Sequence, residues 1–142
     1  MTDRTLDLDS CVVNYITDNT DLPVPIEMGI SDRVGQGIVY VIEPMDVVRR
    51  FMNGRVRRSF AFQFFVKMED WQRATEILDD INRLMEQATA QDIKSSNHSF
   101  QFISAHMTKS PSHKSTLKDA GKTYSVYGAS FVVDAVINNL RG

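Results

Sequence analysis

The apolar positions at the start of the chain follow a helical period. These positions are Leu8, Cys11, Val12, Tyr15 and Ile16. Because a spacing of three and four places them on one side of a helix, residues 6–19 are predicted to form a first helix whose apolar stripe faces a sheet. Pro23 and Pro25 end this helix, and an extended segment is expected from there to Ile30.

The next segment has the pattern of strands. Gly35 and Gly37 mark a polar turn, and the apolar run 38–42 then predicts a buried strand, because β-branched side chains dominate it. Pro44 is expected to interrupt this strand, and residues 47–52 are expected to form another. Two short strands are therefore predicted before the chain reverses.

A hairpin signal follows at Asn53 and Gly54, two residue types that tolerate positive φ. The return strand is predicted from Arg55 to about Met68, and its side chains alternate between two faces. The first face carries Phe60, Phe62, Phe64 and Val66, and the second carries Ala61, Gln63, Phe65 and Lys67. The stretch as a whole is expected to be a structural core attached to a basic surface arm.

The most regular helical pattern begins after Asp70, the expected N-cap. The apolar positions of this long helix are Trp71, Ala74, Ile77, Leu78, Ile81, Leu84, Met85 and Ala88. Residues 100–107 and 124–133 then predict two more strands. The polar segment 108–122 between them predicts a flexible loop that orders on a partner, with a long hairpin tip as the alternative. Val136, Ile137 and Leu140 are expected in a short tail that packs back or docks on a neighbour.

This element order predicts an α+β fold in one domain spanning residues 1–142. Runs of strands with few helices favour a mostly antiparallel sheet, with the long helix and the N-terminal helix packed on one face. The hairpin around Asn53 carries too many arginines for a core and is expected to project from the domain.

Charge is distributed in blocks along the chain, although the net charge is only −2. Residues 1–46 carry nine acids and two arginines, whereas residues 47–67 carry five arginines, one lysine and no acid. Such blocks either attract a second copy head to tail or fold against each other within one subunit.

No apolar run approaches the ~18 residues that span a bilayer, so no membrane partner is expected. The single cysteine, Cys11, fits a reducing compartment, and the acidic start of the chain predicts no secretion signal.

Candidate reacting groups are few. Only Cys11 accompanies the three histidines, His98, His106 and His113, whose spacing of eight and seven does not suit a zinc site. Ser104 and His106 share a strand face, but no nucleophile elbow accompanies them. The sequence therefore predicts no catalytic residue, no metal ligand and no cofactor.

The exception among the charged features is a cluster of arginines on the predicted hairpin. Its members are Arg49, Arg50, Arg55, Arg57 and Arg58. One interpretation is a charged edge that deters unwanted strand pairing. The others are contact with an acidic protein surface or with phosphates, although a pI of about 5.9 argues against a dedicated nucleic-acid binder.

The order of these features resembles the minor capsid and tail terminator proteins of tailed bacteriophages. The similarity follows Asn53-Gly54, residues 59–67, the helix from Trp71 to Ala88, residues 100–103, Pro111 and residues 124–133. The resemblance implies a structural subunit without enzymatic activity or cofactor, which assembles in the host cytoplasm and ends in the virion. It also implies a homo-oligomer, a hexameric ring, that caps the tail tube protein, stops its polymerisation and joins a head-completion or neck protein.

The arginine cluster matches no position of that family, so its role rests on charge alone: a subunit-interface contact, or a lumen contact with weak affinity for genome DNA. The alternatives are a head–tail connector or neck completion protein, a small nucleic-acid-binding protein that uses the arginine hairpin, and a hydrolase built on Ser104 and His106.

Overall fold

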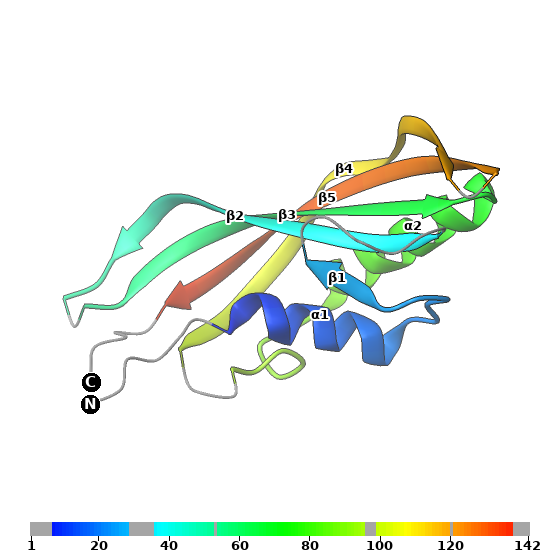
Figure 1. The fold of residues 1–142 in the computed structure, drawn as a ribbon. Helices are drawn as coiled ribbons and strands as arrows, with labels where there is room; N and C mark the ends of the chain where they lie inside the picture. Colours follow the sequence, from blue (N-terminus) through cyan, green and yellow to red (C-terminus); the bar gives the residue numbers. More distant parts are fainter. Residues whose placement is uncertain (1–6, 29–35, 53, 96–98, 120, 138–142) are drawn as a thin grey trace, which may run out of the picture.

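The computed structural model describes residues 7–28, 36–52, 54–95, 99–119 and 121–137. Within these residues the chain forms two helices and one five-stranded sheet of strand order β1-β2-β3-β5-β4 (Figure 1). The helices are α1 (Leu8–Asn19) and α2 (Trp71–Gln87). The strands are β1 (Ile26–Met28), β2 (Gly37–Arg50), β3 (Val56–Met68), β4 (Phe100–Asp119) and β5 (Lys122–Ile137). This mixture of helix and strand agrees with the sequence-based expectation.

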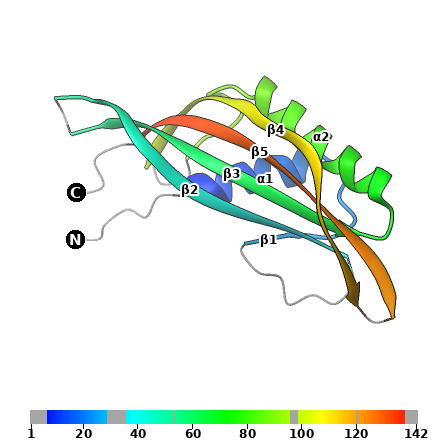
Figure 2. The same ribbon diagram turned by 90° about the horizontal axis from the view of Figure 1, so that it is seen from above.

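The sheet is mostly antiparallel, as predicted. β2 pairs with β3, β3 with β5, and β5 with β4, all antiparallel, whereas the short β1 runs parallel to the start of β2. The long strands β3 and β5 lie in the middle and β4 forms one edge (Figures 1 and 2). In both views the tip of the β2–β3 hairpin lies beyond the ends of the two helices.

The core lies against one face of β3, and its composition confirms the predicted alternation. Phe60, Phe62 and Phe64 are at most 5% exposed, and the ring of Phe62 stacks on that of Phe131 with centroids 5.2 Å apart. The helices add to the same apolar cluster through Leu8, Val12, Ile16, Ala74, Ile77, Leu78, Ile81 and Met85. Burial of these side chains is the main favourable contribution to folding.

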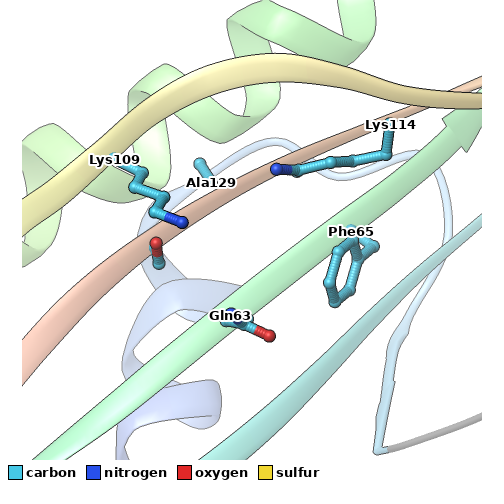
Figure 3. Close-up of a pocket in the computed structure, with 7 residues that line it drawn as sticks. Gln63, Phe65, Lys109, Lys114 and Ala129 are labelled. Atoms are coloured by element: carbon cyan, nitrogen blue, oxygen red, sulfur yellow. The ribbon is translucent and has the colours of Figure 1, made fainter.

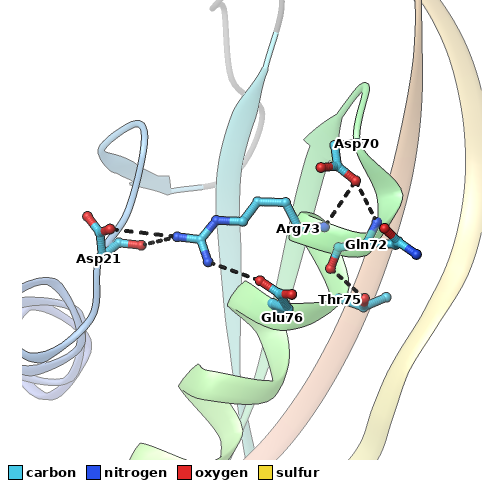
Figure 4. Close-up of polar contacts among 6 residues, drawn as sticks. All are labelled: Asp21, Asp70, Gln72, Arg73, Thr75 and Glu76. Carbon is cyan, nitrogen blue, oxygen red and sulfur yellow. Dashed lines mark hydrogen bonds and ion pairs between the residues drawn. The ribbon is translucent and has the colours of Figure 1, made fainter.

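The start of α2 is fixed by the cap that the sequence predicts. The Asp70 carboxylate accepts hydrogen bonds from the backbone N–H groups of Gln72 and Arg73, at 3.0 and 3.3 Å (Figure 4). The Arg73 side chain then donates to the carbonyl oxygen of Asp21 at 2.9 Å and pairs with Glu76 at 3.4 Å. These contacts join the first turn of α2 to the segment that follows α1.

The predicted strand break at Pro44 is wrong. β2 continues from Gly37 to Arg50, with Pro44 opposite Phe60 and register shifts on either side of Val47. Beyond Tyr40, β2 has no partner on its β1 side among the described residues, so Pro44 lies at a sheet edge. Proline is tolerated at edges and bulges because the missing N–H removes no ladder bond there.

The predicted flexible loop at residues 108–122 is also wrong. This segment continues β4 to Asp119, and Gly121, with φ 79°, lies in the turn into β5. The alternative of a long hairpin is therefore confirmed. The segment has few apolar residues because its side chains from Ser112 to Lys118 are exposed, and the ladder to β5 holds it instead.

The expected tail is in part a strand, since Val136 and Ile137 belong to β5 and pair with Arg57 and Val56. The remaining expectations for Ile30, Gly35, Asn53, His98 and Leu140 lie outside the described residues. Next to Asn53, Gly54 has φ 85°, and Phe51 donates its N–H to the Arg55 carbonyl at 2.8 Å, as a chain reversal requires.

Candidate functional site

The five arginines of the hairpin do not form one patch. Arg49 lies directly opposite Arg57 in the β2–β3 ladder, and Arg50 lies opposite Val56. Arg49 and Arg50 are exposed, whereas Arg55, Arg57 and Arg58 are partly buried. Since Arg57 and Arg58 are adjacent on a strand, their side chains leave opposite faces of the sheet. The cluster therefore divides into an exposed pair on β2 and three partly covered residues at and after the turn.

Three of these arginines have contacts within the chain. Arg57 pairs with Asp134 of β5, its Nη2 lying 3.5 Å from Oδ2, and the other carboxylate oxygen accepts the Ser59 hydroxyl. Arg55 donates to the Gln101 side-chain oxygen at 3.4 Å. The Arg49 guanidinium lies 5.2 Å from the centre of the Phe51 ring, within cation–π range. Most of the cluster is thus oriented by its own subunit.

The side of the sheet that carries Ala61, Gln63, Phe65 and Lys67, which we call the second face, is only partly covered. Ladder partners share a face, so it also carries Val39, Val41, Gly128, Ser130 and Val132. Val41 is 39% exposed, Phe65 is partly buried and Gln63 is exposed. This face combines apolar and polar groups, as protein–protein interfaces do.

A cleft of about 150 Å³ opens on the second face, between β3, β5 and β4. Its lining consists of Gln63, Phe65, Lys109, Lys114, Gly128, Ala129 and Ser130. Figure 3 shows the two lysine side chains reaching from β4 toward the same space above β5 and β3. Neither lysine has an ion pair or a side-chain hydrogen bond within the described part of the chain. The cleft is therefore a concentration of positive charge beside an aromatic ring.

The candidate reacting groups of the sequence are not assembled. Ser104 and His106 lie opposite Asp134 and Val132 on the second face, and no hydrogen bond joins them. His113 contacts Thr116 at 3.1 Å and the edge of the Tyr127 ring. Cys11 is partly buried against the core. Among the described residues, no group of three or more potential metal ligands lies together.

Two tyrosines near α1 have perturbed protonation. Burial raises the pKa of Tyr40 to about 12, helped by its hydrogen bond of 3.0 Å to Asp9. Burial and the charge of Asp92 also raise the pKa of Tyr15. Both phenols stay protonated at neutral pH, and the Tyr40 hydroxyl donates its hydrogen bond to Asp9.

Neither helix in the described part of the chain has the length and apolar character needed to cross a membrane.

In comparisons with known proteins, no family model and no curated sequence shows a significant match to the chain.

The sequence prediction missed the cleft and Asp134. Gly128 was the available signal, because an isolated glycine inside a strand often marks a close approach of another group. The position of Lys109 and Lys114 depends on irregularities of β4 that residue spacing does not reveal.

Proposed function

We propose that this chain is a structural subunit of a tailed bacteriophage, a tail terminator without enzymatic activity or cofactor. It forms a ring, a hexamer, on the end of the tail tube, stops tube polymerisation and offers a surface to the head-completion or neck protein. The subunit assembles in the host cytoplasm and remains in the virion.

The observation that carries this proposal is the partly exposed second face with Val41 and Phe65. In the proposed subunit both helices pack on the opposite face and the β2–β3 hairpin projects. The exposed part of the second face is then available to a neighbour, with apolar area providing most of the affinity. Arg49 and Arg50 at the exposed end of the hairpin would meet an adjoining subunit or the lumen, where contact with genome DNA is weak and screened by salt.

Light scattering and negative-stain imaging of the purified protein test this proposal. We expect a concentration-dependent oligomer with a central hole, and binding to the ends of tail tubes. Val41→Glu places a charge on the second face and should abolish the ring. Met28→Glu, a change at another exposed apolar position, should leave it intact. A protein that remains monomeric at high concentration, with tube protein present as well, would contradict the proposal.

The principal alternative is a head–tail connector or neck completion protein with a similar subunit. Co-sedimentation separates the two functions, because a terminator follows tail tubes and a connector follows portal-bearing heads. A nucleic-acid-binding role is supported by a single observation, the exposure of Arg49 and Arg50. That role requires an affinity for DNA that falls steeply with salt.

A further inference from the structure

We propose that the cleft beneath β4 binds a carboxylate group presented by a partner protein, with Lys109 and Lys114 as its ligands. That the partner is a protein rests on the proposed function, whereas the affinity for a carboxylate rests on the cleft alone.

Bulges in β4 bring the two lysines together. Residues five apart on a regular strand leave opposite faces, because side chains alternate. The β4–β5 register shifts between Lys109 and Ser112 and again between His113 and Ser115. The first shift adds one residue to β4 relative to β5 and so turns position 114 to the face of position 109, and Lys114 itself lies within the second irregularity. As a result, Lys109 and Lys114 line one cleft.

Gly128 provides the space beneath the lysines. A β-carbon at this position would lie 2.9 Å from Cε of Lys114 and 3.0 Å from Cδ1 of Phe65. Any side chain here would push the lysine or the ring aside, so the absence of one keeps the cleft open. Gly128 has no unusual φ, and its role is therefore one of space.

The lining suits an oxyanion. Two ammonium groups reach toward one space, and no carboxylate of the described residues pairs with either of them. A bound anion would offset the repulsion between the two positive charges. The Gln63 amide and the Ser130 hydroxyl, which also line the cleft, provide further donors. Hydrogen bonds from ammonium groups to carboxylates are among the stronger ones in proteins.

The surroundings favour a protein carboxylate over a nucleic-acid phosphate. Phe65 lines the cleft, and the partly buried Val39 and the more exposed Val41 lie on the same face. The next lysine on this face, Lys67, lies 5.1 Å from the centre of the Tyr124 ring. Further along the face, the Arg57 guanidinium is paired with Asp134. Nucleic-acid sites instead follow the phosphates with a continuous track of positive charge.

The experiment titrates the full chain at constant ionic strength, with acetate replacing chloride, and follows the backbone amide signals of Gly128 and Ser130 by NMR. We expect saturable shifts. Lys109→Ala with Lys114→Ala should weaken acetate binding by about ten-fold, the scale of lost hydrogen bonds to a charged group. Lys94→Ala with Lys118→Ala removes the same charge outside the cleft and should leave the affinity unchanged.

A second arm uses an acidic peptide of glutamate and alanine and a short duplex DNA. The peptide should move the same amide signals at lower concentration than acetate, and the DNA should not. Equal weakening in the two double variants, or tighter binding of DNA at these amides, would overturn the proposal. If the protein binds acetate but never forms a ring, the result would support the carboxylate site and contradict only the terminator function.

Discussion

Arg57 and Asp134 form an ion pair between the central strands β3 and β5, with Nη2 and Oδ2 3.5 Å apart. The Asp134 side chain is only 18% exposed, and its second oxygen accepts the hydroxyl of buried Ser59. One carboxylate thus orients the base of the arginine hairpin and satisfies a buried hydroxyl. Within the described part of the chain, the buried Nε of Arg57 has no hydrogen-bond partner, so the ion pair with Asp134 is the main interaction that offsets the partial burial of this guanidinium.

Asp134→Ala should lower the free energy of unfolding by about 1–3 kcal/mol, because it leaves a partly buried cation and a buried hydroxyl without an acceptor. Urea denaturation measures this change. Asp134→Asn keeps a neutral acceptor and should cost less. An unchanged midpoint in the alanine variant would show that the pair does not stabilise the fold.

The N-cap of α2 supports a second prediction. Asp70→Ala removes the acceptor for two backbone N–H groups and should cost about 1 kcal/mol. Asp70→Asn preserves a capping oxygen and should cost a few tenths. Asp79→Ala breaks an exposed pair with Arg83 on the same helix and is the matched control, since exposed pairs contribute little. A cost for Asp79→Ala equal to that of Asp70→Ala would contradict a specific role for the cap.

Tyr40 predicts a dependence of stability on alkaline pH. Its pKa is about 12 in the folded chain, against an ordinary value of 10.0. The folded state therefore holds the phenol proton more tightly than the unfolded state does. Its contribution to stability is complete below pH 10 and is lost as the pH rises through 10 toward 12.

Tyr40→Phe should remove most of this loss, while the ring keeps its stacking on Phe64. Thermal unfolding of both proteins across the alkaline range measures the difference. Tyr15 has a pKa shifted in the same direction and leaves a residual slope in the variant. If the unfolding temperatures of the two proteins fall in parallel as the pH rises, this role for Tyr40 is contradicted.

Gly128→Ala tests the cleft without changing charge. The added β-carbon meets Lys114 and the Phe65 ring at about 3 Å, so the lysine should shift and the acetate affinity should fall. Cross-peaks from the Lys114 methylene groups to position 128 would report that displacement by NMR. Unchanged acetate binding would show that the space above Gly128 is not used.

How much of this fold follows from the sequence depends on how strongly one face of each element is buried. The alternation of Phe60, Phe62 and Phe64 and the stripe of α2 specify their elements, because misplacing either would expose several large apolar side chains. Asp70 and Gly54 mark ends through local geometry alone.

The remainder depends on partners far along the chain. Pro44 predicts a strand break unless its position at the sheet edge is known. The exposed part of β4 predicts a loop, because backbone pairing with β5 holds this segment and its side chains show no apolar pattern. Lys109 and Lys114 line one cleft because of bulges in β4, and residue types do not determine where these bulges occur. Nothing in the sequence distinguishes Asp134 from the other acidic residues, because its role depends on the pairing of β5 with β3, which places it beside Ser59 and Arg57.

The exposed arginines of β2 give the last prediction. Arg57 and Arg58 are partly buried and carry buried Nε atoms, so their replacement would disturb the fold as well as any contact. Arg49→Ala with Arg50→Ala is the cleaner change, because both side chains are exposed. If the hairpin meets DNA in a lumen, the protein should show weak, salt-dependent duplex binding. The double variant should then reduce the slope of log affinity against log salt concentration by about one unit per lost phosphate contact.

Fluorescence anisotropy over a range of salt concentrations measures this slope, with Lys94→Ala and Lys118→Ala as the control of equal charge. An unchanged slope in the arginine variant would assign these residues to a protein contact or to edge protection instead.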